Sequence, residues 1–400
     1  MSVQAYAAGP KTEPVNMEIV DGVPHILNGT IPSSGVEILE LKEQWRIGGD
    51  DDEILLGVIV AALNDDDGNV YLLDNSLTQV NVFSPEGEFL RAISRNGEGP
   101  GEVNHPIHML WMPDGALGIV QGYPGKIVKV NRKGDPMGTV SSMTADPSAG
   151  GFIIMRDAYF RNGIFAVCGE RMTMSDEGFD RSRFLALWDL DGTETIRLLE
   201  TNVPSPLGQP RYIEKDEYFV YGGRWTLGPD GRIYAAPERD FYSINVYKPD
   251  GSLERVIKRE FTSWTRTPEE KAFIGPDMNM VVNGEVVEFE REVEDRDPCI
   301  TNLRVFGTGE LWVYHSFSGH DQPPGILQTY DIFDAEGLFW KQVAIAVPGD
   351  AQNDLLIWTD DRHAILIKGA GSGQAPGDGS GDEGDAEDGG EPIEIIYYSR

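Results

Sequence analysis

The chain has 400 residues, of which 40% are hydrophobic, and its 66 acidic and 33 basic residues give a formal net charge of −33. Because no basic stripe could neutralise phosphates, nucleic acid is excluded as a partner and anionic membrane surfaces are disfavoured. No apolar stretch approaches the length of a transmembrane helix. The charge indicates a soluble acidic surface, with adaptation to a salty environment as the alternative.

The N-terminal residues 1–34 are polar and predict a flexible extension that would suit a tether to a membrane or cell surface. Residues 1–10 lack the charged region and apolar core of a signal peptide. We therefore expect either a cytoplasmic chain or one whose signal has already been removed. Residues 36–41 alternate apolar and polar side chains, as a half-buried strand does.

A repeating unit follows, in which residues 67–74 and then 80–87 read as strand, turn, strand and tight turn. In each unit Asp-Gly or Asn-Gly supplies the positive φ angles of a two-residue hairpin turn. The flanking runs are rich in β-branched and aromatic residues, which suit strands. Further copies span 113–135, 162–192, 229–251 and 308–337, and the most degraded copy spans 355–367 with 393–397.

These units predict an all-β fold. A short strand before the first turn, as at 107–112, and another after the second, as at 89–93, give four strands per unit. Four-stranded units that recur at roughly 40–50 residues or more are typical of propeller blades. The sequence therefore predicts a six-bladed β-propeller with four-stranded antiparallel blades, forming a single domain over residues 35–400.

Closure of the ring needs a strand from outside the sixth unit, which runs to Arg400. We expect the N-terminal strand at 36–41 to pair into the last blade and so remove an exposed sheet edge. A free edge strand before the first blade is the alternative.

Two segments interrupt the repeat. Residues 262–297 form a rim insertion, with a helix predicted at 267–273 and an extra hairpin around Asn283-Gly284. This insertion either carries a binding function or is a decorative loop. Residues 371–391 are dense in Gly, Asp and Glu and predict a disordered loop, because the acids lack the regular spacing of a calcium loop. Cys168 and Cys299 either pair across blades or remain buried thiols.

The segment GEGPGEVNHP at 97–106 resembles the linker of NHL-repeat propellers, with Val103 where that family has Phe. YLLD at 71–74 and VFSPEG at 82–87 also match. The match is close across the first two units, fair in the fourth and weak in the others. The resemblance implies a six-bladed propeller of the type abundant among exported bacterial proteins, and hence an extracytoplasmic location in the periplasm or at the cell surface.

The same fold neighbourhood includes amidating lyases, gluconolactonase-like hydrolases and streptogramin lyases, whose metals or bases lie where the inner strands meet the central channel. Three converging imidazoles could hold zinc, but no spacing here forces convergence, so we expect no cofactor, with zinc or calcium as the lesser alternative. The acids at 50–53 and 65–67 are expected to face solvent. The resemblance makes His105, Arg224 and His315 the catalytic candidates and His105, His108 and His315 the metal candidates, with His320 and His363 as further histidines to test.

Two functions remain open. The first is a non-catalytic binding or scaffold propeller that docks a protein, peptide or glycan on its rim or channel mouth, with Trp225, Trp264 and Tyr314 as contact aromatics. The alternative is a metal-dependent lyase or hydrolase, lactonase-like or amidating-lyase-like, with its site at the central channel. The fold alone does not choose between them.

Overall fold

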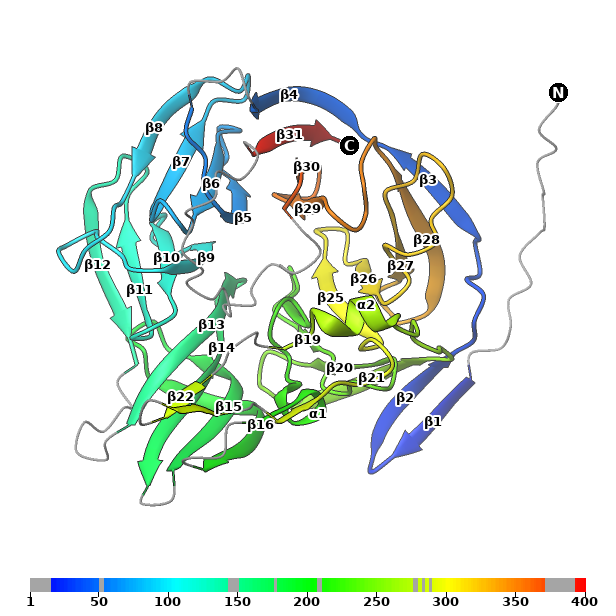
Figure 1. Ribbon diagram of the computed structural model, residues 1–400. Coiled ribbons are helices and arrows are strands. Elements are labelled where there is room, and N and C mark those ends of the chain that lie inside the picture. The colour runs from blue at the N-terminus through cyan, green and yellow to red at the C-terminus, as the bar shows by residue number, and fades with distance from the viewer. Residues whose placement is uncertain are drawn as a thin grey trace, which may run out of the picture.

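The computed structural model describes residues 16–49, 54–142, 151–175, 178–206, 211–275, 280–282, 285–287, 290–370 and 393–400. Six β-sheets form the blades of a ring (Figure 1). In each blade the first strand of the sequence repeat lies nearest the centre, and the N-terminal strands that join some blades lie at the outside. The predicted two-residue turn is wrong for the hairpins at Gly68 and Gly115, whose loops have three residues: the N–H of Gly68 donates to the carbonyl of Asp65, and the N–H of Asp65 donates to the carbonyl of Asn69. The positive φ expected of the glycine is present, at 83° for Gly68 and 79° for Gly115, but the preceding aspartate does not share it. Only glycine adopts such angles without strain.

Blades 1 to 3 are each built from four consecutive antiparallel strands. Their strands are β5 (Ile59–Asn64), β6 (Val70–Asp74), β7 (Gln79–Phe83) and β8 (Phe89–Ile93); β9 (Pro106–Trp111), β10 (Leu117–Gln121), β11 (Lys126–Val130) and β12 (Pro136–Ser141); and β13 (Gly151–Arg161), β14 (Ile164–Ser175), β15 (Gly178–Trp188) and β16 (Glu194–Pro206).

Blades 4 to 6 are built in the same way but also receive strands from the N-terminal region. Their own strands are β18 (Trp225–Leu227), β19 (Ile233–Ala235), β20 (Ser243–Tyr247) and β21 (Leu253–Arg259); β25 (Ile300–Val305), β26 (Leu311–His315), β27 (Gln328–Phe333) and β28 (Phe339–Ala346); and β29 (Leu355–Trp358), β30 (His363–Ile367) and β31 (Glu394–Ser399).

The N-terminal region forms a belt, residues 16–48, along the outside of these three blades (Figure 1). The hairpin of β1 (Asn16–Val20) and β2 (Val23–Asn28) extends blade 4, where β2 runs parallel to β21. β3 (Val36–Glu40) runs parallel to β28 of blade 5, and β4 (Lys42–Gly48) is the antiparallel fourth strand of blade 6. Ring closure by an N-terminal strand is therefore confirmed.

Two predictions for this region are corrected. The closing strand is β4 and not the strand at 36–41, because β4 buries Trp45 and Ile47 whereas Val36 and Ile38 of β3 remain 61% and 65% exposed. The prediction of a flexible extension over 1–34 is wrong for residues 16–28, whose strands gain backbone hydrogen bonds along the edge of blade 4. Residues 1–15 lie outside the described residues.

The acids of the turn between β5 and β6 differ in exposure. Asp66 and Asp67 face solvent, as expected, but Asp65 is buried. Its carboxylate accepts the backbone N–H groups of Asp67 at 3.0 Å and Asn69 at 2.8 Å, so Asp65 stabilises its own turn.

The core lies between blades. The buried side chains form six hydrophobic clusters in the described chain, and each combines residues from two neighbouring blades. At the seam between blades 6 and 1, the Trp45 indole stacks on Tyr397 at 4.7 Å and donates a hydrogen bond to the Pro85 carbonyl at 3.1 Å. β4 therefore ties the last blade to the first.

The rim insertion contains the predicted helix as α2 (Pro268–Ala272), with Thr267 and Glu270 in a reciprocal capping box. The predicted extra hairpin is present as β22 (Met280–Val282) and β23 (Glu285–Val287). β24 (Glu290–Glu292) then pairs with β17 (Arg211–Ile213), which leads into the short helix α1 (Glu214–Glu217). The acidic segment 371–391 lies outside the described residues.

Glu214 anchors the insertion to the ring. Its buried carboxylate accepts hydrogen bonds from Arg239 at 2.5 Å, from Arg266 at 2.7 Å and from the backbone N–H of Glu294 at 2.9 Å. Burial alone would raise the pKa of Glu214, but the hydrogen bonds from both arginines outweigh it and lower the pKa. None of the described helices has the length and apolar character needed to cross a membrane.

Candidate functional site: the central channel

A cavity of about 860 Å³ runs through the centre of the ring, and the inner strands of all six blades line it. Pockets of roughly 300–1,000 Å³ are typical of sites for small molecules. Since each blade is an antiparallel meander that begins with its inner strand, the six inner strands run in one direction. The channel therefore has one end where these strands start and another where they finish.

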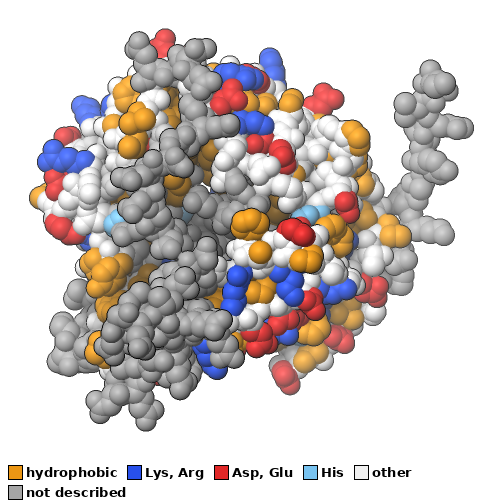
Figure 2. Space-filling view, in the orientation of Figure 1, with side chains coloured by type: hydrophobic (Ala, Val, Ile, Leu, Met, Phe, Trp, Pro, Cys, Tyr) orange, Lys and Arg blue, Asp and Glu red, His pale blue; other side chains and the backbone are white. Residues whose placement is uncertain are grey.

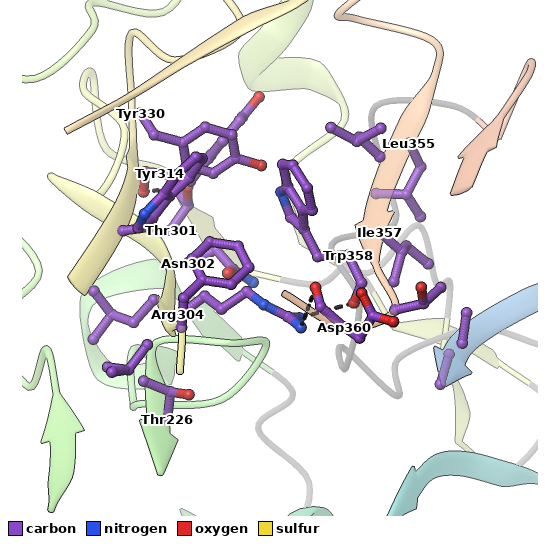
Figure 3. A pocket seen from close by; sticks show the side chains of 18 of the residues that line it. Thr226, Thr301, Asn302, Arg304, Tyr314, Tyr330, Leu355, Ile357, Trp358 and Asp360 are labelled. Atoms are coloured by element: carbon purple, nitrogen blue, oxygen red, sulfur yellow. Dashed lines mark hydrogen bonds between the residues drawn. The ribbon is translucent and has the colours of Figure 1, made fainter. Parts of the chain in front are cut away.

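Aromatic side chains form much of the channel wall. In Figure 3 the rings of Tyr314, Tyr330 and Trp358 point into the same space. The two tyrosine rings are 5.6 Å apart, and Trp358 packs edge-on against Phe306 at 5.4 Å. Burial raises the pKa of Tyr314 to about 12, so its phenol stays neutral at physiological pH. These rings are fixed by packing and offer flat apolar surface with hydroxyl groups beside it.

The insertion mouth is the end where the inner strands start, because the rim insertion directly precedes β25 (Figure 1). Its lining includes Asp297, His320, Ala351 and Gln352. His320 stacks on Trp264 at 4.3 Å, and Gln352 donates a hydrogen bond to the carbonyl of Gly319 at 2.9 Å.

The arginine end is the opposite end, where Arg161 is the last residue of β13 and Arg304 the last but one of β25. Arg304 donates to the carbonyls of Trp358 at 2.8 Å and Asp360 at 3.2 Å (Figure 3). Arg161 reaches the carbonyls of Leu227 at 3.4 Å and Val305 at 3.2 Å. Its side chain thus extends from blade 3 to blade 5.

The carboxylates of the channel are already engaged by the protein. At the insertion mouth Asp297 pairs with Arg266 at 2.5 Å, and Asp354 binds Lys368. At the arginine end Asp361 accepts the backbone N–H of Gly307 at 2.7 Å, and Asp360 binds the ring of His363 at 2.8 Å. Neither Arg161 nor Arg304 lies within 4.0 Å of a carboxylate in the part of the chain that the structure describes.

Of the predicted catalytic and metal residues, His108 and His315 line the channel and His105 does not. Burial lowers the pKa of His108 to about 4, so its ring, which packs on Tyr159 at 5.0 Å, is neutral. His315 accepts the backbone N–H of Phe317 through Nδ1 at 3.1 Å. His105 is exposed in the loop before β9.

Convergence on a metal is not seen in the described chain, where no three His, Cys, Asp or Glu side chains form a group that could hold an ion. His315 instead joins a buried network, since its Nε2 lies 3.4 Å from Asp331. His363 stacks on Tyr397, and Arg224 donates to the carbonyls of Phe219 and Tyr221 away from the channel lining.

The predicted contact aromatics have three different environments. Tyr314 lines the channel, and Trp264 is half-buried beside the insertion mouth, where its N–H donates to Glu270 at 3.2 Å. Trp225 is fully buried, which corrects its prediction as a ligand contact, because it packs between blades 3 and 4 and donates to Asp157 at 3.3 Å. Cys168 and Cys299 are both free and buried.

Sequence reasoning missed Arg161, Arg304, Tyr159 and Trp358. The usable signal was a basic residue inside or ending a predicted inner strand, as Arg304 is in ITNLRV.

The model of a family described as a 6-bladed beta-propeller (DUF5128) matches residues 51–111. That match covers β5 to β9 and agrees with the ring of six sheets. The protein is a six-bladed β-propeller. No curated protein matches the sequence.

Several solved structures are similar. A member of the DUF4221 family from Bacteroides vulgatus is 10% identical, with 90% of this chain and 97% of that chain covered and a TM-score of 0.47. Regucalcin from Agrobacterium tumefaciens, a calcium-binding protein, is 10% identical, with 90% of this chain and 96% of that chain covered and a TM-score of 0.43. Virginiamycin B lyase from Staphylococcus aureus is 11% identical, with 89% of this chain and 99% of that chain covered and a TM-score of 0.40. At these scores neither calcium binding nor lyase activity carries over to this propeller.

Proposed function

We propose that this propeller is a non-catalytic binding protein that takes its ligand, or the end of a peptide or glycan ligand, into the central channel through the insertion mouth. The observation that carries the proposal is the channel of about 860 Å³ with fixed aromatic walls. Its groups that could transfer protons are poorly suited to that task, since burial lowers the pKa of His108 to about 4 and makes its ring a weak base, and Asp297 and Asp360 are bound to protein partners. Such a wall binds and orients a ligand without supplying an acid and base pair.

Entry at this mouth is favoured by its exposed polar rim. Gln352 is exposed, whereas the neighbouring Tyr314 is half-buried deeper in the channel. A ligand entering here would exchange water for aromatic contact as it moves inward. The resemblance of residues 97–106 to NHL-type propellers supports an exported or surface-associated protein, which protease accessibility on intact cells would test.

The test is a thermal-unfolding screen with short peptides, oligosaccharides and small organic acids. Gln352→Trp places a bulky side chain in the mouth, and Lys133→Trp is the matched control at an exposed site outside the channel lining. We expect at least one class of compound to raise the Tm of the wild type by several degrees through binding to the folded state. That shift should disappear in Gln352→Trp and persist in Lys133→Trp. Equal shifts in both variants would contradict binding through this mouth.

The alternative, a metal-dependent lyase or hydrolase, requires a metal set. His105, His108 and His315 do not supply one, because His105 is exposed outside the channel lining and His315 is engaged with Phe317 and Asp331. The residues present therefore do not fit a three-histidine zinc site. Metal analysis of the purified protein separates the two functions, because one equivalent of zinc or calcium would support the enzyme.

A further inference from the structure

We propose that the arginine end of the channel is an anion site, in which Arg161 and Arg304 hold the carboxylate or phosphate group of a small ligand whose flat apolar part lies against Tyr159 and Trp358. The inference rests on the proposed channel function and adds the chemical class of the ligand. Three features support it: the local charge, the unused hydrogen-bond donors and the shape of the wall.

The charge at this end is opposite to that of the whole protein. Its lining contains three cationic side chains and two carboxylates, a positive excess in a chain of net charge −33. Acidic, basic and hydrophobic side chains are interspersed over the described part of the face shown in Figure 2. The residues concerned are Arg161, Arg304, Arg362, Asp360 and Asp361.

Both guanidinium groups retain donors that the described residues do not use. Among these residues Arg161 donates only through Nη1, to two carbonyls, which leaves Nη2 and Nε for a ligand. Arg304 uses Nη1 and Nη2 once each, and its buried Nε has no hydrogen-bond partner in the described chain. A guanidinium has five N–H donors in a planar fork that matches a carboxylate or phosphate.

The two arginines lie close together, since Arg161 donates to the carbonyl of Val305, the residue that follows Arg304. Burial lowers the pKa of Arg304, Tyr159 and the Asp361 carboxylate act in the opposite direction, and the charge of Arg161 adds a smaller repulsion that lowers the pKa further. Asp361 is held by the N–H of Gly307, so its oxygen is directed to the backbone. An anion between the arginines would remove the repulsion and take up the unused donors together.

The wall beside the arginines is flat and rigid. Tyr159 is held edge-on between His108 and Trp225, with ring centroids 5.0 and 4.9 Å away. Trp358 is held by Phe306 and by Trp312, whose ring is 5.7 Å away. Two fixed aromatic surfaces favour a planar apolar body over a fully hydrated one. The site thus fits an aromatic carboxylate or an aryl phosphate.

The probes are benzoate and phenyl phosphate, with benzamide as the neutral match for benzoate, each titrated into the full chain by calorimetry. We expect both anions to bind the wild type and benzamide to bind at least ten-fold more weakly. The tighter of the two anions identifies the group that the site prefers. Benzamide binding as tightly as benzoate would overturn the proposal, and this comparison needs no variant.

Arg161→Gln and Arg304→Gln should each weaken anion binding at least ten-fold and abolish the discrimination against benzamide. The matched control is Arg224→Gln, because Arg224 also donates only to backbone carbonyls but lies outside the channel lining. Unchanged affinity in both channel variants would overturn the site.

Two outcomes separate this site from the proposed channel function. If peptides or sugars raise the Tm of the wild type but not of Gln352→Trp, while neither anion binds, the channel function stands and the anion site is wrong. If anions bind through the arginines but Gln352→Trp has no effect, the proposed mouth is wrong and the anion site stands.

Discussion

The two ends of the channel bury charge in opposite ways. At the insertion mouth the charges pair with one another, since Glu214 holds Arg239 and Arg266, and Arg266 also holds Asp297. At the arginine end Arg161 and Arg304 donate to backbone carbonyls and keep further N–H groups unused. We infer from this difference that the insertion mouth stabilises the protein itself, and we propose that the arginine end binds another molecule.

The largest effect is expected from Glu214→Ala, which removes the buried carboxylate that Arg239 and Arg266 share and leaves each of them only its more exposed partner, Asp240 or Asp297. Removing one partner of a buried ion pair typically costs about 3–5 kcal/mol of stability. Denaturant unfolding measures this change. The control is Glu43→Ala, whose pair with Arg46 is exposed and should cost less than about 1 kcal/mol. Similar losses in both variants would mean that the Glu214 cluster does not hold the insertion mouth.

A second test concerns Asp157, the carboxylate behind the channel wall. Burial raises the pKa of Asp157 to about 7, while hydrogen bonding from Trp225 and the charge of Arg156 oppose the rise. Because an aspartate in the unfolded chain ionises near pH 3.8, the folded state binds more protons between that pH and 7. Stability therefore falls as the pH rises through this window, by up to about 4 kcal/mol.

Asp157→Asn should remove this pH dependence while keeping an oxygen to accept from Trp225. The expected result is a wild type that loses stability relative to the variant between pH 4 and pH 8, as measured by urea unfolding. Glu214 behaves in the opposite sense, because its lowered pKa gives stability that is lost on acidification. Parallel profiles for the wild type and Asp157→Asn would contradict the assignment.

A smaller effect is expected from Arg161→Met without added anion. The variant loses two hydrogen bonds to carbonyls but also removes one of two repelling charges, so the net change should be about 1 kcal/mol or less. Urea denaturation in a chloride buffer that contains neither carboxylate nor phosphate measures it. A loss as large as that of Glu214→Ala would show that Arg161 is a structural bridge between blades 3 and 5, and the contrast between the two ends would disappear.

The smallest effect on global stability is expected from Thr267→Ala, which removes the cap of α2 at the insertion mouth. Loss of a cap costs about 1 kcal/mol, and here the cost should stay local to a short exposed helix. Hydrogen exchange should speed up for the amides of α2 and not for those of β25. Thr308→Ala, at an exposed turn, serves as the control and should leave both unchanged.

The fold was largely predictable because its information is local. Each Asp-Gly or Asn-Gly turn marks a hairpin through its own local sequence. The blades can therefore be recognised one at a time from glycines such as Gly68 and Gly115. The belt was not predictable in the same way. Residues 36–41 and β4 both have patterns that suit strands, and only burial of Trp45 against Tyr397 shows which of them closes the ring.

The site was less predictable because it is assembled from distant parts of the chain. Arg161 reaches Val305, 144 residues away in the sequence, and no local pattern shows that their strands face each other across the channel. The prediction for Trp225 is wrong because a tryptophan at a strand end has the same sequence pattern whether it is buried or exposed. The histidines were easy to single out by type, yet only His108, His315 and His320 among those predicted line the channel.

The belt also determines how the ring responds to mechanical load. A pull on the chain from the N-terminal side of β1 must separate β1 from β2, then β2 from β21 and then β3 from β28 before β4 is pulled away from β31. We expect four successive rupture events in a single-molecule pulling measurement, with the ring opening in the last. A propeller anchored through this region would therefore keep its channel intact under load, because the three outer pairings break first.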